Sequence, residues 1–141
     1  MSHHLVIFGG KICTAADSMF ADIGIKDGQI VSIGRDLDRT GAEVIDATGK
    51  LVLPGGIDSH VHLQGELSPN GRLNTVNFSS ADNALDAARH ARTTLMAGFT
   101  SAQEVGGQLE ASVALRNAIR DGDVIGPRLR VSGPAVTPTG G

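Results

Sequence analysis

The sequence predicts an α/β protein in two parts, the first all-β and the second an alternation of strands and helices. Short apolar strands separated by glycine-containing turns fill residues 1–53. Beyond residue 54, apolar residues recur at the 3.6-residue period of helices, and strands stand between the helical segments. These two observations predict two domains, residues 1–53 and residues 54–141.

The first part contains two turn signals of different strength. Leu5–Phe8 and Lys11–Ala15 flank Gly9–Gly10, a pair able to adopt the positive φ values of a tight hairpin. Asp27–Gly28 is a stronger signal, because it stands between two strands whose apolar residues partly alternate. Five or six short strands at regular spacing predict a small β-sandwich or a portion of one.

The second part predicts a strand–helix alternation that begins at the apolar segment around residue 54. The expected elements that follow are a helix over Asn83–Ala97, a strand over Thr100–Val105, a helix over Leu109–Arg120 and a strand over Arg128–Val136. Ser79-x-x-Asp82 predicts an N-terminal capping box for the first helix. A βαβαβ order of this kind favours a parallel sheet.

Composition excludes several classes of protein. The 141 residues carry a formal net charge of −3 and no basic cluster, so no nucleic-acid partner is expected. No apolar run approaches the roughly 20 residues that span a bilayer, and no secretory signal precedes Leu5, which predicts a cytoplasmic protein without membrane contact. The single cysteine, Cys13, is expected to be a small buried apolar side chain.

Two histidines are the candidate metal ligands of this sequence. On an extended strand, residues two apart point the same way, so His60 and His62 present two imidazoles on one face, spaced for one cation such as Zn, Fe, Ni or Mn. Asp58 has the same parity but lies two residues further from the open end of the strand, so we expect it to support the site and not to bind the metal. Gln64, one step further out, is a candidate for substrate contact. The alternative interpretation is a pair of surface histidines, and His90 is expected to lie on a solvated helix face.

The context of the pair indicates a family. Pro54-Gly-Gly-Ile-Asp-Ser-His-Val-His62 follows an apolar segment where the hairpins give way to βαβ units. Together with the Ile23–Ile33 hairpin and the Asp46–Lys50 turn, it resembles the amidohydrolase superfamily. There, the first strand of a (β/α)₈ barrel carries His-x-His after a small β-sandwich. The resemblance implies the N-terminal part of a β-sandwich followed by the first strands and helices of a TIM-type barrel.

Two further segments, Ala87–Thr100 and Gly126–Gly141, look like the prolidase-type and imidazolonepropionase-related branch of that superfamily. Known members of this branch include metal-dependent dipeptidases that cleave acyl-amino-acid bonds. A dihydroorotase would typically carry arginine two positions beyond the second histidine, where this chain has Gln64. The chain also has Gln103–Glu104 where relatives commonly have an Arg-Asp pair.

The resemblance implies hydrolysis of an amide C–N bond by metal-activated water, on a small amide or dipeptide substrate. His60 and His62 would bind a divalent metal, with zinc the first choice, as one or two ions. The other ligands and the general base come from later strands in this family, so no catalytic residue is assigned in this chain. A complete barrel needs about 250 residues. We therefore expect an N-terminal part of a longer polypeptide that is inactive alone and forms homo-oligomers when complete.

Three alternatives stay open at this point. The first is a cyclic amidase or deaminase built on the same scaffold. The second is a relative that keeps the fold, loses the metal and serves in assembly. The third is a short chain that works alone as a binding module. Turnover on dipeptides, hydantoins and aminated bases separates the enzyme classes, and metal content separates an enzyme from an assembly protein.

Overall fold

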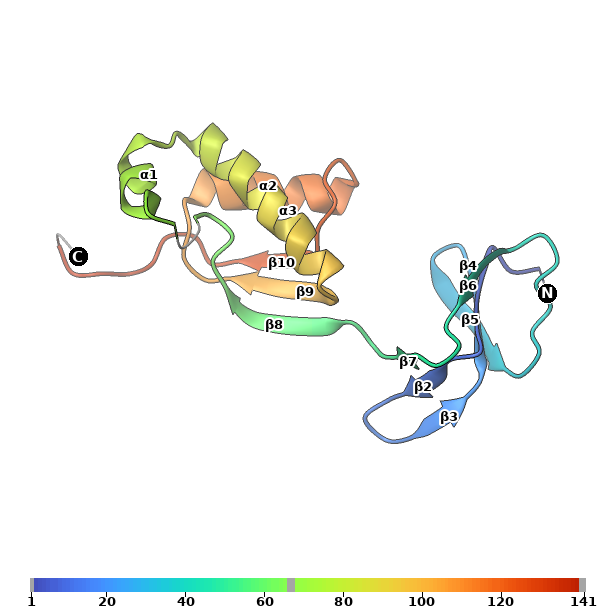
Figure 1. The fold of residues 1–141 in the computed structure, drawn as a ribbon. Coiled ribbons are helices and arrows are strands. Elements are labelled where there is room, and N and C mark those ends of the chain that lie inside the picture. The colour runs from blue at the N-terminus through green and yellow to red at the C-terminus, as the bar shows by residue number, and fades with distance from the viewer. Residues whose placement is uncertain (1, 66–67, 140–141) are drawn as a thin grey trace. The chain divides into compact units, whose positions relative to one another are not determined.

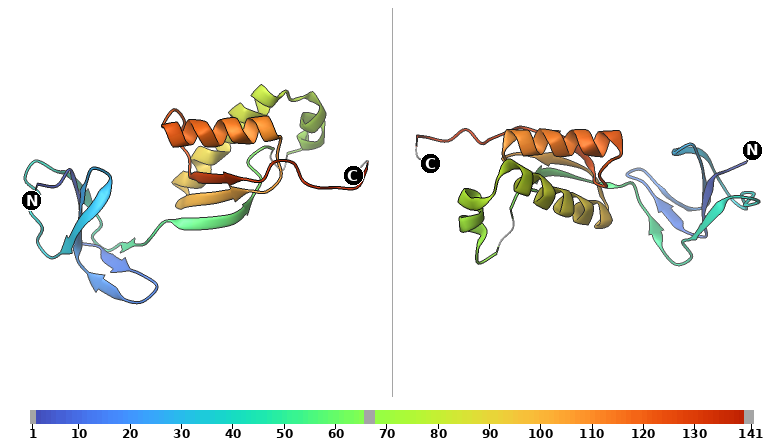
Figure 2. Two further views of the ribbon diagram at one scale, coloured as in Figure 1. Left: turned by 180° about the vertical axis from the view of Figure 1, so that it is seen from behind. Right: turned by 90° about the horizontal axis from the view of Figure 1, so that it is seen from above.

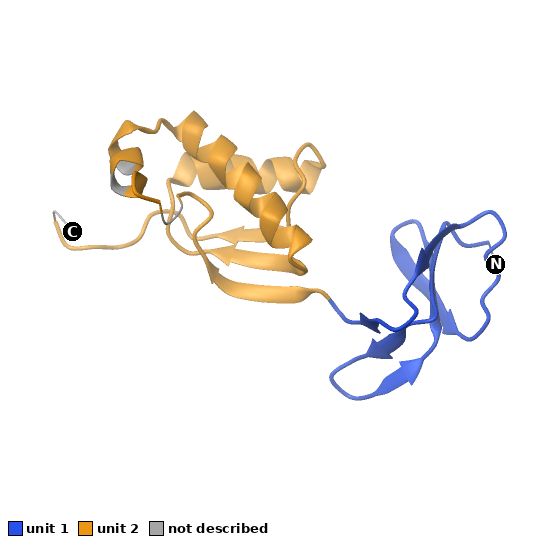
Figure 3. Ribbon diagram, in the orientation of Figure 1, with its two compact units in different colours: residues 1–54 blue, residues 55–141 orange. Residues whose placement is uncertain are grey.

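A computed structural model describes residues 2–65 and 68–139, and within them the chain is a mixed α/β protein. It divides into two compact units, residues 1–54 and residues 55–141 (Figure 3). Gly140 and Gly141, which end the segment predicted for the second domain, lie outside the described residues. In the described part of the chain, the regular elements of the first unit are all strands, and the second unit combines strands and helices (Figure 1).

Unit 1 consists of two small sheets. One has four strands in the order β5-β4-β1-β6, and the other has three in the order β3-β2-β7. The strands are β1 (Leu5–Phe8), β2 (Lys11–Cys13), β3 (Ser18–Phe20), β4 (Asp22–Lys26), β5 (Gln29–Gly34), β6 (Glu43–Asp46) and β7 (Leu51–Val52). Val6 and Ile23, on the neighbouring strands β1 and β4, are buried in the four-stranded sheet.

The two turn signals of unit 1 have different outcomes. β4 and β5 form the predicted antiparallel hairpin, and Asp27 (φ 52°) and Gly28 (φ 73°) both take the positive φ of a type I′ turn. The predicted hairpin at Gly9–Gly10 is wrong, because β1 pairs with β4 and β6 whereas β2 pairs with β3 and β7. Gly9 (φ 73°) instead turns the chain out of one sheet and into the other.

Unit 2 is built on a parallel sheet in the order β10-β9-β8, as the βαβαβ pattern predicts. Its strands are β8 (Gly56–Val61), β9 (Phe99–Glu104) and β10 (Arg128–Val131). Two long helices, α2 (Ser80–Met96) and α3 (Leu109–Asp121), lie beside each other over one face of the sheet (Figures 1 and 2). Within residues 55–65 and 68–139, which the structure describes, no helix covers the other face.

Both long helices begin and end close to the predicted residues. The Ser79 hydroxyl accepts a hydrogen bond from the Asp82 backbone N–H, while the Asp82 carboxylate accepts one from the Ser79 backbone N–H, which confirms the capping box of α2. Gly122 (φ 86°) ends α3 in the left-handed conformation. A short helix not predicted from sequence, α1 (Gly71–Asn77), precedes α2.

The core of unit 2 lies between the sheet and the helices. It consists of small and branched apolar side chains from every layer: Leu63, Ala87, Ala91, Ala102, Leu115 and Leu129. The opposite face of the sheet is open, and Ile57 there is 76% exposed. A cavity of about 330 Å³ runs along this open face. None of the described helices is long and apolar enough to cross a lipid bilayer.

Candidate metal-binding site

An irregularity in β8 decides which way the histidines point. Asp58 stands opposite Ala102 and Val61 stands opposite Glu104, so β8 contains one extra residue between these two pairs. A bulge of this kind shifts the alternation of side chains by one. Ser59 and His60 are accordingly both exposed, and Val61 returns to the side of the helices, where it packs against the core.

The expectation that Asp58, His60 and His62 share one parity is therefore wrong for Asp58. Asp58 lies on the alternation that precedes the bulge, and the two histidines lie on the one that follows it. Asp58 Oδ1 accepts a hydrogen bond from the His60 backbone N–H at 3.1 Å. The carboxylate thus supports the bulge itself, since it accepts a backbone N–H that belongs to the bulge.

His60 and His62 come together at the carboxyl end of β8. Both are exposed on either side of Val61, and their ring centroids are 5.3 Å apart with an interplanar angle of 77°. A cation about 2.1 Å from one nitrogen of each ring, in tetrahedral coordination, would hold two imidazole centroids about 5 Å apart. The pair therefore fits two ligand positions of one metal ion.

The ring of His62 is oriented by the loop after β9. His62 Nδ1 lies 3.3 Å from the carbonyl oxygen of Gly106. A carbonyl oxygen only accepts hydrogen bonds, so Nδ1 carries a proton in this contact, and in the neutral ring Nε2 then keeps its lone pair. This is the arrangement by which proteins fix the tautomer of a metal-binding histidine.

A buried carboxylate that the sequence did not single out lies next to this ring. Glu104, the last residue of β9, is only 2% exposed. Its Oε2 accepts the Leu63 backbone N–H at 2.5 Å, its Oε1 accepts the Gly106 backbone N–H at 3.1 Å, and Oε1 lies 3.7 Å from His62 Nδ1. A charged residue that ends a strand, two residues before the Gly106–Gly107 pair, is the signal that could have drawn attention to it.

Gln64, the candidate for substrate contact, has partners within the protein at both ends of its amide. Oε1 accepts the Gln108 backbone N–H at 2.7 Å, and Nε2 donates to the Gln108 carbonyl at 3.1 Å and to the Ser112 hydroxyl at 2.6 Å. These bonds attach the loop after β8 to the first turn of α3. A substrate contact for Gln64 stays a prediction.

His90 does not lie on a solvated face, contrary to the expectation. Its side chain is 19% exposed, and its Nδ1 donates to the Leu63 carbonyl at 2.8 Å. Asp86, one turn earlier on α2, lies 3.8 Å from the same nitrogen. Leu63 is thereby held at both its polar backbone groups, by Glu104 on one side and by His90 on the other.

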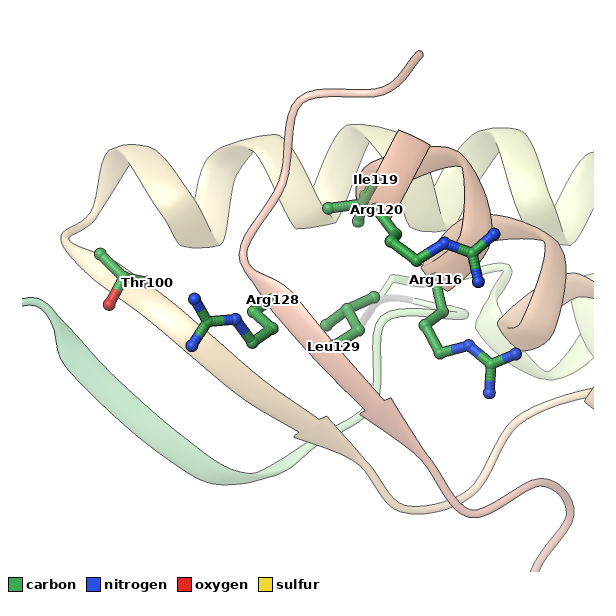
Figure 4. Close-up of a pocket in the computed structure, with 6 residues that line it drawn as sticks. All are labelled: Thr100, Arg116, Ile119, Arg120, Arg128 and Leu129. Carbon is green, nitrogen blue, oxygen red and sulfur yellow. The ribbon is translucent and has the colours of Figure 1, made fainter. Parts of the chain in front are cut away.

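No third ligand joins the pair within the described residues, where no group of three or more His, Cys, Asp or Glu side chains could hold a metal ion. A cavity of about 540 Å³ in unit 2 lies elsewhere, between α3 and β10 (Figure 4). It is lined by Thr100, Arg116, Ile119, Arg120, Arg128 and Leu129, and neither histidine reaches it. The candidate site is thus the open end of β8.

Comparison with known proteins shows the family of the chain. Residues 51–139 match the model of the amidohydrolase family, and the chain belongs to this family. It is 47% identical over 94 residues to the D-hydantoinase of Geobacillus stearothermophilus, a match that covers 67% of this chain and 19% of the hydantoinase.

Solved structures give a second set of relatives. A Xaa-Pro dipeptidase with bound methionine superposes with a TM-score of 0.81 at 28% identity, covering 97% of this chain and 35% of that one. A prolidase complexed with N-methylphosphonate-L-proline superposes with a TM-score of 0.78 at 30% identity, covering 97% and 33%. The chain thus spans about a fifth of the hydantoinase and about a third of each solved chain.

Proposed function

We propose that the whole protein hydrolyses an amide C–N bond with metal-activated water, and that His60 and His62 are two of its metal ligands. The observation that carries this proposal is the pair of imidazole rings at the carboxyl end of β8, whose centroids are 5.3 Å apart. His62 Nδ1 lies within hydrogen-bond distance of the Gly106 carbonyl oxygen. Membership of the amidohydrolase family supports it, because relatives such as the D-hydantoinase act on carbon–nitrogen bonds.

The proposed fold of the whole protein places this site where such chemistry is found. We take unit 2 as the first strands and helices of a (β/α)₈ barrel and unit 1 as part of a β-sandwich, supported by solved structures that match 97% of the chain. Active sites of these barrels lie at the carboxyl ends of the strands, where His60 and His62 are. Imidazole ligands suit zinc, as one or two ions.

When bound, a divalent metal polarises a carbonyl group and lowers the pKa of water to about 7. The residues of this chain have two tasks in that chemistry. His60 and His62 provide neutral nitrogen donors, and the Gly106 carbonyl keeps the His62 ring in the tautomer with Nε2 available. The general base is assigned to none of these 141 residues.

We favour a dipeptide or N-acyl amino acid as the substrate. Two solved relatives that match 97% of the chain are a Xaa-Pro dipeptidase and a prolidase. Arg130 adds a chemical reason, since it stands one residue before the carboxyl end of β10, next to Gln103 in the register, and its guanidinium suits a substrate carboxylate.

A cyclic amide is the second candidate, because the 47% identity with D-hydantoinase covers two thirds of the chain. The two candidates differ in charge, since a dipeptide carries a carboxylate and a hydantoin ring does not. The test is turnover by the metal-loaded whole protein on Xaa-Pro dipeptides, N-acyl amino acids, hydantoins and aminated bases. Faster turnover of the carboxylates supports the first candidate, and hydantoin turnover alone replaces it with the second. No turnover on any of them contradicts the proposed activity.

A further inference from the structure

We propose that Glu104 is a positioning residue for His62. Its buried carboxylate holds the two loops that meet at this histidine, and so keeps Nε2 directed at the metal. The inference rests on the proposed function in that it takes His62 as a metal ligand. It goes further by giving a role to a side chain that contacts neither metal nor substrate.

The burial of Glu104 requires an explanation. A carboxylate removed from water costs free energy unless its oxygens are hydrogen-bonded. At 2% exposure, Glu104 satisfies this condition with two backbone donors, the Leu63 N–H and the Gly106 N–H, one on each oxygen. Leu63 follows β8 and Gly106 follows β9, so a single side chain joins the two loops that follow neighbouring strands.

Both joined residues control His62. Leu63 is the next residue in the chain, so fixing its N–H fixes the peptide unit from which the His62 ring projects. Gly106 supplies the carbonyl oxygen that His62 Nδ1 contacts at 3.3 Å. The same carboxylate oxygen that accepts the Gly106 N–H lies 3.7 Å from Nδ1, so Glu104 faces the ring directly as well. The backbone next to His62, the carbonyl group that its ring contacts and the position of the ring itself thus all depend on the carboxylate of Glu104.

Two further contacts show how closely the ring is held. A Cβ atom at Gly106 would stand 3.1 Å from His62 Cε1, so the loop after β9 lies against the ring with little room to spare. The other polar backbone group of Leu63 is also bonded, because His90 Nδ1 donates to its carbonyl oxygen at 2.8 Å. Loss of the Glu104 carboxylate would remove the hydrogen bond to the Leu63 N–H and the hydrogen bond to the Gly106 N–H. Leu63 would then keep only the bond from His90.

The charge of the side chain is part of the role. Glutamate presents two acceptor oxygens to two N–H donors, whereas glutamine presents one oxygen and one NH₂ group. In Glu104→Gln, one backbone N–H would therefore face another donor, and one loop would move away although the shape of the side chain is kept. Glu104→Asp keeps both acceptors but draws them back by one methylene group.

The test measures metal binding by the whole protein in four forms: wild type, E104Q, E104D and the control E110Q. Glu110 is an exposed glutamate in the first turn of α3, so E110Q removes the same charge without touching the site. We expect E104Q to bind zinc about 10–100-fold more weakly and to change the visible spectrum of the Co(II)-substituted protein. E104D should recover part of the affinity, and E110Q should match wild type.

Wild-type affinity and an unchanged Co(II) spectrum in E104Q would overturn the proposal. If E104Q does not fold, as judged by circular dichroism, the comparison of E104D with E110Q decides in the same way. A second readout needs no metal: ¹⁵N spectra of the histidine rings in the metal-free protein at alkaline pH. We expect His62 to be a single Nδ1–H tautomer in wild type and a mixture in E104Q, and equal spectra would contradict the role.

These readouts separate the two proposals. A wild-type protein that binds no metal contradicts the proposed function, whereas the ring spectra then still decide whether Glu104 sets the orientation of His62. A wild-type protein that binds metal, with E104Q behaving identically, contradicts the positioning role alone.

Discussion

Replacement of Gln64 by alanine tests whether this side chain is a structural link or a substrate contact. The variant removes three hydrogen bonds, of 2.7, 3.1 and 2.6 Å, which join the loop after β8 to Gln108 and Ser112 of α3. At about 1 kcal/mol each, their sum would be about 3 kcal/mol. Two of the three share Nε2, and water can reach Gln108, so we expect Gln64→Ala to lower the free energy of unfolding by about 1–2 kcal/mol.

Hydrogen exchange is the most direct assay. The Gln108 N–H donates to Gln64 Oε1, so its exchange should become roughly tenfold faster in Gln64→Ala, in line with a loss near 1.4 kcal/mol. Urea unfolding of the whole protein gives the accompanying change in stability. Gln29→Ala, at an exposed glutamine of β5, is the matched control and should change neither quantity.

The opposite pattern would show that Gln64 is not a structural link. If Gln64→Ala left Gln108 exchange and stability unchanged but raised KM for the best substrate, the amide would be a substrate contact. A structural link predicts the reverse: lower stability and faster exchange, with KM altered only as far as the loop itself moves.

Further predictions concern the core and the capping box of unit 2. Leu115→Ala should cost about 2–5 kcal/mol in urea unfolding, because Leu115 is buried between the sheet and the helices. Ser79→Ala should cost about 1 kcal/mol through loss of the N-cap of α2, and Ser79→Asp should restore most of it. Hydrogen bonds from the Ser79 side chain and backbone lower the pKa of Asp82 below 3.8. A carboxylate whose pKa is lowered in the folded state stabilises the fold above pH 3.8, and this contribution is lost as pH falls through the folded-state pKa. In Asp82→Asn, the free energy of unfolding should therefore depend less on pH in that acid range.

Local signals predicted much of the fold. The capping box at Ser79 predicted the start of α2 within a few residues, because a helix cap depends on contacts inside a single turn. Asp27–Gly28 placed a hairpin for the same reason. Gly9–Gly10 failed because the partners of β1 are β4 and β6, which lie far along the chain and outweigh a short turn preference. The short helix α1 has no side-chain cap and no acidic residue in its first turn, so it left no comparable signal.

The site was predicted in part. His60 and His62 lie together as expected, but the bulge that separates them from Asp58 depends on how β8 pairs with β9, which strand alternation alone does not reveal. Glu104 was seen only as a departure from related sequences. Its burial and its two backbone donors come from loops that meet in three dimensions, 41 residues apart for Leu63. His90 was misplaced for the same reason, since its partner is the Leu63 carbonyl.

The metal content of the whole protein shows whether His60 and His62 bind a metal ion. The protein would be purified without chelator, and its metal measured by mass spectrometry for wild type, His60→Gln/His62→Gln and the control His4→Gln. His4 is an exposed histidine of unit 1, remote in sequence from the pair. We predict one or two divalent ions per chain in wild type and in the control, and loss of bound metal in the double variant. A metal-free wild type, or a double variant that retains its full metal content, would contradict it.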